Sequence, residues 1–310
     1  MKKIISFLCI LTVQWSFSQV GNDKKIIAKN QLKSSFEKHC FTGSNSGCTS
    51  FFKAYDRRGN VIEWNMGRIG TFYRSTYDKN DNKIALQWID KIDTTDVTLF
   101  KYAYDKYGNL IKDEDGVYKN DYDKRGNLIQ ITSETKNGTN AIKRKTVLQV
   151  WSDFNKLLSK TTKIEIISES SQPTLKDLYV KTYKYDGNQN LIKELHFSNY
   201  QVKNTITYSY DNSNRLIEKI EINPSRLEQL NNMTFGHRAP LTAITTRMSY
   251  NTNGSIKEKY TYFSDPCMSL DNHFLYKHHY LDNGLLSQVD VYENDEQRFS
   301  ISYDYEYFNK

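Results

Sequence analysis

Aromatic, turn-forming and aliphatic residues recur along this chain at fixed offsets. Nine aromatic anchors are each followed, four residues later, by Gly, Asn, Asp or Gln. Six residues after the anchor comes Val, Leu or Ile in eight copies and Lys83 in the ninth. The residue directly after the anchor is Asp in six copies. The anchors are Tyr55, Tyr77, Tyr104, Tyr122, Trp151, Tyr185, Tyr210, Tyr250 and Tyr280.

Each offset has a physical cause. An Asp, Asn or Ser after the anchor accepts a hydrogen bond from the backbone two residues on, which starts a type I turn. Gly, Asn or Asp three residues later tolerates the left-handed conformation that returns the chain to its partner strand, and Gln189 is the exception. A type I turn followed by a left-handed residue is a three-residue hairpin with a bulge. The pattern therefore predicts nine hairpins, with each anchor opposite the residue six ahead.

Nine hairpins give about 18 strands, or roughly 85 Å of sheet at about 4.8 Å per strand. We expect an all-β fold, an antiparallel meander of about nine hairpins that coils into a spiral, a partial shell or a closed barrel-like sheet. The turns would share one edge, and variable loops, of which 222–245 is the longest, would lie along the other. The alternating segment Tyr303–Tyr307 predicts a last strand.

The N-terminus is typical of an exported protein. Lys2 and Lys3 precede an apolar run, and Ser16 and Ser18 supply the small residues at positions −3 and −1 of a cleavage site. Residues 1–18 are therefore predicted to be a signal peptide. Residues 19–50 carry no repeat and would cap the first strand, and residues 51–310 would form the repeat domain. Such a protein would reside in the periplasm, at the cell surface or outside the cell. No other apolar run is long enough for a transmembrane helix.

Three cysteines lie beyond the signal peptide. Cys40 and Cys48 would close a short loop by a disulfide in an oxidising compartment. Cys267 is left over, free or paired with one of the other two, and the spacing matches no common zinc pattern.

Composition and motifs narrow the function. The net charge of +7 comes without any basic run, which argues against nucleic-acid binding. The sequence contains no cofactor-binding motif, no set of metal ligands and no catalytic motif. Adjacent His278 and His279 would point to opposite faces of a strand. The segment Asp78–Asn82 resembles the start of a calcium-binding loop, but a turn explains it better. We therefore expect a protein without catalytic, cofactor or metal sites.

The units Tyr104–Ile111 and Tyr122–Ile129 resemble the YD repeats of the Rhs family, which includes bacterial toxin-wrapping shells and the animal teneurins. The resemblance covers about residues 51–310 and implies a spiralling strip of β-hairpins with a binding or enclosing role. Because this sequence is far shorter than the large members and shows no toxin domain after its repeats, we do not expect the toxin-delivery role of the family to apply to it.

These observations favour an exported, non-catalytic scaffold that binds a protein or carbohydrate surface. Its contacts would come from the loop at 222–245, with Phe235, His237 and Arg238, and from exposed rings such as Tyr107 and Tyr200. Two alternatives are an accessory or remnant component of a polymorphic toxin system and a secreted hydrolase with an unrecognised site.

Overall fold

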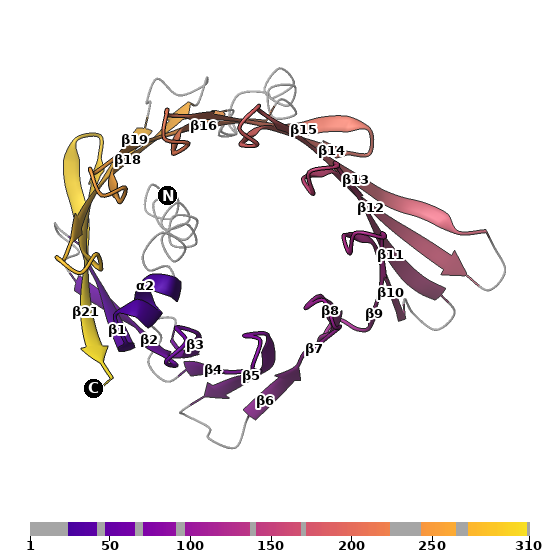
Figure 1. The fold of residues 1–310 in the computed structure, drawn as a ribbon, viewed down its shortest axis with the longest axis horizontal. Coiled ribbons are helices and arrows are strands. Elements are labelled where there is room, and N and C mark those ends of the chain that lie inside the picture. Colours follow the sequence, from indigo (N-terminus) through magenta and orange to yellow (C-terminus); the bar gives the residue numbers. More distant parts are fainter. Residues whose placement is uncertain are drawn as a thin grey trace, which may run out of the picture. The chain divides into compact units, whose positions relative to one another are not determined.

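The computed structural model describes residues 24–41, 47–65, 71–90, 97–136, 141–168, 172–223, 243–264 and 272–308. Nineteen strands of this part form one antiparallel sheet, while β7 and β8 form a separate ribbon (Figure 1). Successive strands pair with each other, which confirms the all-β antiparallel meander. The elements are α2 (Lys24–Lys29), β1 (Leu32–Phe41), β2 (Gly47–Tyr55), β3 (Val61–Trp64), β4 (Thr71–Tyr77), β5 (Lys83–Asp90), β6 (Val97–Lys101), β7 (Ala103–Tyr104), β8 (Leu110–Lys112), β9 (Tyr118–Tyr122), β10 (Leu128–Lys136), β11 (Ala141–Trp151), β12 (Leu157–Ser168), β13 (Thr174–Tyr185), β14 (Leu191–Ser198), β15 (Gln201–Tyr210), β16 (Leu216–Ile222), β17 (Ala243–Tyr250), β18 (Ile256–Ser264), β19 (Asn272–Tyr280), β20 (Leu286–Glu293) and β21 (Glu296–Tyr307).

The chain divides into two compact units. Unit 1 comprises Met1–Leu99, Tyr250–Glu258 and Leu275–Lys310, and unit 2 comprises Phe100–Ser249 and Lys259–Phe274. Among the described residues, no helix has the length and apolar character needed to cross a bilayer.

The nine turns have the backbone that their residues predict. The residue four after each anchor has a positive φ, between 56° and 87°, in every copy. Gln189 adopts this conformation too, at φ 64°, although an unbranched polar side chain has none of the local advantages of Gly or Asn there. The turns are therefore fixed by geometry even where the residue type departs from the pattern.

The strand register agrees with the predicted pairing. In seven hairpins the register places the anchor opposite the residue six ahead, and a bulge lies immediately beside this pair. Trp151 faces Leu157 and Tyr210 faces Leu216, for example. Seven of the predicted turns are thus confirmed as hairpins of the bulged type, and the turns after Tyr250 and Tyr280 share their positive φ and turn hydrogen bonds.

The two ends of the chain build a tenth hairpin in unit 1. Strand β1, expected as part of a cap, lies between β2 and the last strand β21 (Figure 1). Tyr307 of β21 faces Leu32 of β1 and a bulge lies beside this pair, as an anchor faces its aliphatic partner elsewhere. Ser35 of β1 forms a 2.8 Å hydrogen bond with the hydroxyl of Tyr55, the next anchor. Residues about 270 positions apart thus complete the repeat without a connecting turn.

Helix α2 occupies the place of the missing turn. Ile27 packs with Leu32, Tyr55 and Leu285 in a buried cluster of unit 1. Leu285 stands where most other turns carry a polar residue, and it is fully buried. The ninth turn is therefore apolar because a helix covers it. A helix this short is stabilised mainly by such packing.

The position of helix α2 also explains why residue 59 is glycine. A Cβ at Gly59 would lie 2.5 Å from the backbone oxygen of Lys24 in α2, whereas a Cβ at Gly126 would meet nothing within 4 Å. Both residues have nearly the same φ, 83° and 82°.

Gly59→Ala and Gly126→Ala therefore form a matched pair. We expect Gly126→Ala to lower the free energy of unfolding by about 1–2 kcal/mol through the left-handed backbone alone. Gly59→Ala should cost at least about 1 kcal/mol more, because it also displaces α2. Urea denaturation of both variants measures the difference, and equal losses would show that α2 does not pack on the first turn.

Candidate functional site

Each Asp after an anchor organises its own turn. The Asp56 carboxylate accepts hydrogen bonds from the backbone N–H groups of Arg58 and Asn60, both at 2.9 Å, and from the Asn60 side chain at 2.9 Å. Asp78 and Asp123 receive the corresponding bonds in their turns. Asp78 thus uses its carboxylate on its own turn, and among the described residues no group of three metal-binding side chains comes together.

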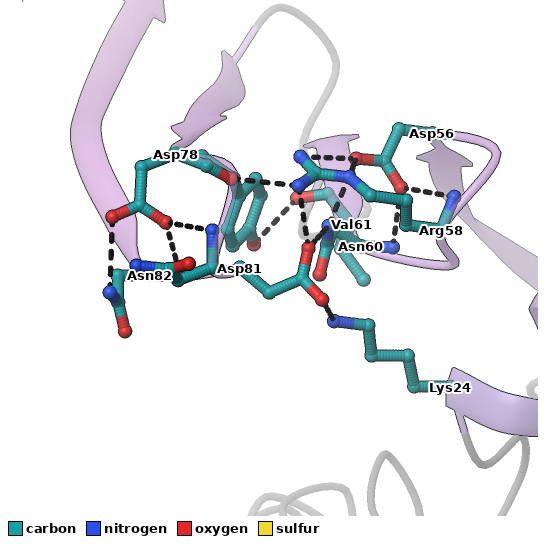
Figure 2. A network of polar contacts seen from close by, with 10 residues as sticks. Lys24, Asp56, Arg58, Asn60, Val61, Asp78, Asp81 and Asn82 are labelled. Atoms are coloured by element: carbon teal, nitrogen blue, oxygen red, sulfur yellow. Dashed lines mark hydrogen bonds and ion pairs between the residues drawn. The ribbon is translucent and has the colours of Figure 1, made fainter. Parts of the chain in front are cut away.

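Polar side chains also join the first two turns to each other and to α2. Asp81 receives Asn60 Nδ2 at 2.9 Å, Arg58 at 2.9 Å and the Lys24 ammonium group at 2.7 Å, and Arg58 donates to the backbone oxygen of Asp78 at 2.7 Å (Figure 2). The hydrogen bond from Lys24, followed by that from Asn60, lowers the pKa of Asp81. These acceptors are occupied by the protein itself, so the network holds the turns in place.

A cleft of about 420 Å³ lies beside this network in unit 1. Its lining includes Asp56 with Arg58 and Glu63 with Arg74, and each Arg is ion-paired with its carboxylate, at 3.3 and 2.9 Å. The cleft therefore offers a ligand no uncompensated charge.

Consecutive hairpins meet where the second strand of one pairs with the first strand of the next, and we call this contact a joint. The anchor side chains form hydrogen bonds at these joints. At six joints the strand ladder stops at the same point, where the residue eight after one anchor pairs with the residue three before the next aromatic. Beyond that point the strands separate, and a backbone carbonyl loses its strand partner. The next aromatic donates to this carbonyl: Tyr77 to Val61, Trp151 to Leu128, Tyr185 to Leu157, Tyr210 to Leu191 and Tyr305 to Leu286.

Removing one of these hydroxyl groups tests the role. Tyr185→Phe should lower the free energy of unfolding by about 1–2 kcal/mol, because the Leu157 carbonyl loses its donor. Tyr107→Phe is the control: its ring is 52% exposed, so the loss should stay within about 0.5 kcal/mol. Similar values for both in urea denaturation would contradict the role of the anchor hydroxyl.

We call the sheet surface that carries the anchors of unit 2 the anchor face. It holds a network of ionisable groups on β14, β15 and β16. Glu194 accepts hydrogen bonds from Tyr208 at 2.5 Å and from His196 at 2.9 Å. Glu221 accepts from Asn204 at 2.6 Å and from Lys219 at 3.2 Å. Both carboxylates are thus held by side chains of neighbouring strands.

Burial and hydrogen bonding oppose each other in this network. Burial acts to raise the pKa of Glu194, but the bonds from Tyr208 and His196 outweigh it and the pKa lies below its ordinary value. For Glu221, burial is likewise outweighed by Asn204 and Lys219, so its pKa is also lowered. Burial, together with the charge of Lys219, lowers the pKa of Lys259. The carboxylates therefore stay ionised and act as fixed acceptors.

These lowered pKa values predict acid sensitivity. A carboxyl group with a lower pKa in the folded than in the unfolded chain stabilises the fold above the ordinary value of 4.5, and this stability is lost as the pH falls through the folded value. Glu194→Gln should therefore flatten the stability profile below pH 4.5. Urea denaturation between about pH 3 and 7 measures it, and an unchanged acid slope would contradict the role of Glu194.

A second feature of the anchor face is a transverse row of polar side chains. The register places Gln149, Lys160, Lys181, His196 and Asn204 directly opposite one another across five strands, β11 to β15. Exposed Tyr179 lies two residues from Lys181 on the same face. We call these five residues the polar row.

The residues predicted from the sequence fall into three groups. Cys40 and Cys48 face each other in β1 and β2 and form a disulfide. Tyr107 packs on Tyr122 with a centroid distance of 4.5 Å, whereas Tyr200 is 81% exposed. Three predictions lie outside the described residues. They are the signal peptide at 1–18, the loop contacts Phe235, His237 and Arg238, and the role of Cys267.

Sequence reasoning did not identify the polar row or the hydrogen-bonding role of the anchors. One signal was present for the anchors: all nine are Tyr or Trp and none is Phe, so every anchor carries a polar hydrogen.

No protein-family model matches the chain, and no curated protein matches it. A crystal structure described as TcdB2-TccC3-TEV is similar to it, at 11% identity and a TM-score of 0.30 over 84% of this chain and 16% of that one. A second, TcdB2-TccC3-Cdc42, has 12% identity and a TM-score of 0.31 over 82% and 19%. A porin-like protein from Bacteroides uniformis has 10% identity and a TM-score of 0.33 over 89% of this chain and 98% of its own.

This chain thus spans less than a fifth of the length of the two TcdB2-TccC3 chains. With TM-scores near 0.3, these likenesses carry no argument about function. The resemblance to YD repeats stays a prediction, and the functional argument rests on the geometry of this chain.

Proposed function

We propose that this protein is an exported, non-catalytic β-repeat scaffold of the cell envelope or exterior that binds a protein or glycan surface. Two features support export: the N-terminal sequence and the Cys40–Cys48 disulfide, a bond that persists in oxidising compartments. The carboxylates of Glu194 and Glu221 are held by neighbouring side chains, which supports a structural rather than a catalytic role for them.

The observation that carries the proposal is Tyr200. It lies in the two-residue turn between β14 and β15, with φ 70°, next to Asn199 at φ 47°. Such turns favour Gly at positions of positive φ, and a bulky side chain is uncommon there. The ring is 81% exposed and adds little to packing. A strained backbone that presents an exposed ring is typical of a contact residue.

The turn itself is held rigidly. Asn199 donates its backbone N–H to the Leu178 carbonyl at 2.8 Å and accepts the Leu178 N–H through Oδ1 at 2.9 Å. Both bonds fix the turn to the neighbouring strand β13. A ring presented from a rigid turn loses little conformational entropy on binding, which favours recognition.

Tyr200→Gly separates contact from folding. It relieves the left-handed strain and should raise the free energy of unfolding by up to about 1 kcal/mol, while weakening binding to whole cells and to a glycan array. Gln189→Gly is the control, because it relieves the same strain at φ 64° in another turn and removes no ring. Equal binding by the two variants and the parent protein would contradict a contact role for Tyr200.

A further inference from the structure

The polar row contains an unfavourable arrangement. Lys160 of β12 and Lys181 of β13 are direct cross-strand neighbours, and neither forms an ion pair within the described residues. Like charges placed directly opposite each other in a sheet are destabilising. Lys181 helps to lower the pKa of the Glu194 carboxyl group, but the oxygens of Glu194 accept hydrogen bonds from Tyr208 and His196. The charge of this one carboxylate therefore compensates the lysine pair only in part.

Further cations share this face. Lys143 and Lys145 of β11 are exposed and lie at even spacings from Gln149, so they point to the same side as the polar row. Asp177 is a carboxylate of this face, opposite Ile164. On this face of β11–β13 four cations, Lys143, Lys145, Lys160 and Lys181, thus stand against the one carboxylate of Asp177. The anchor face of β11–β13 is therefore cationic.

The length of the polar row and the exposed ring of Tyr179 indicate which class of partner the anchor face can bind. Five strands at about 4.8 Å spacing make the polar row about 19 Å long, enough for several units of a chain molecule. Tyr179, 43% exposed, offers a ring beside Lys181, and such rings have an apolar face and a polar tip. Strands β12, β13 and β14 are paired on both sides, so a peptide cannot bind here by adding a strand.

We propose that the anchor face of β11–β13 binds a linear acidic glycan, with Lys160 and Lys181 holding its anionic groups and Tyr179 contacting a sugar ring. The inference rests on the proposed binding function and specifies the class of ligand. The repulsion within the lysine pair is then a feature of the free protein that binding relieves, since the anion supplies further negative charge.

The chain offers a matched test. Lys184 and Lys193 form a second direct lysine pair, and Lys184 lies three residues beyond Lys181 on β13, an odd spacing that places it on the opposite face. Lys181→Glu and Lys184→Glu change the net charge equally and each turns a like-charged pair into an opposite-charged one. Both variants should therefore be as stable as the parent protein or slightly more stable.

Binding should separate the two variants. Alginate and chondroitin sulfate are the probes and neutral dextran the control, measured by titration calorimetry with the full chain at 50 and 300 mM NaCl. The parent protein should bind both acidic polymers, more weakly at high salt. Lys181→Glu should weaken binding at least about tenfold, and Lys184→Glu should leave it within about twofold.

Three results would overturn the inference: no binding of either acidic polymer, equal weakening by both variants, or tighter Lys181-dependent binding of duplex DNA or anionic vesicles. Failure here is distinct from failure of the proposed function. Binding to cells that Tyr200→Gly weakens and Lys181→Glu does not would leave a scaffold that binds a different ligand.

Discussion

A backbone carbonyl that loses its strand partner at each joint is the constraint on which the rest of the structure depends. The bulge beside the anchor, given by the register in seven hairpins, turns the strands apart, so the ladder between consecutive hairpins ends before the turns begin. An unpaired, partly buried carbonyl costs free energy comparable to a lost hydrogen bond. At five joints the Tyr or Trp of the next hairpin supplies the donor, as Tyr185 does for Leu157, whereas Asn120 donates to the Leu110 carbonyl. Each hairpin is thereby completed by its successor.

The same rule accounts for the chain ends. A hairpin at either end of a row would have an open edge, which is a liability for any sheet. Unit 1 avoids it by pairing β1 with β21, with Tyr305 bonded to Leu286 as an anchor would be. The turn that would join these strands is absent, and α2 packs in its place against Leu285. The disulfide ties β1 to β2, so the composite hairpin is linked covalently on that side.

Much of this fold follows from the sequence because its determinants are local. Asp, a left-handed residue and an aliphatic residue at fixed offsets set the turn, and the turn sets the register, so that Gln189 adopts φ 64° even without the favoured side chain. The tenth hairpin has no turn and therefore no local signal. The polar row depends on the register between hairpins, which the sequence does not reveal because the loops between hairpins vary in length. Once one joint is known, however, the others follow, because the offsets of eight and three recur.

The places where local rules are broken are informative for the same reason. A sequence that satisfies turn chemistry so regularly gives weight to its exceptions. Tyr200 occupies a conformation that suits Gly, and Lys160 faces Lys181 although the alternating pattern leaves room for any polar residue. Neither arrangement stabilises the free protein, and both place chemistry on accessible parts of unit 2. By contrast, the apolar Leu285 departs from the turn pattern and is explained within the fold by α2. An exception with a packing partner is structural, and an exposed exception without one is where the proposed binding function would place its contacts.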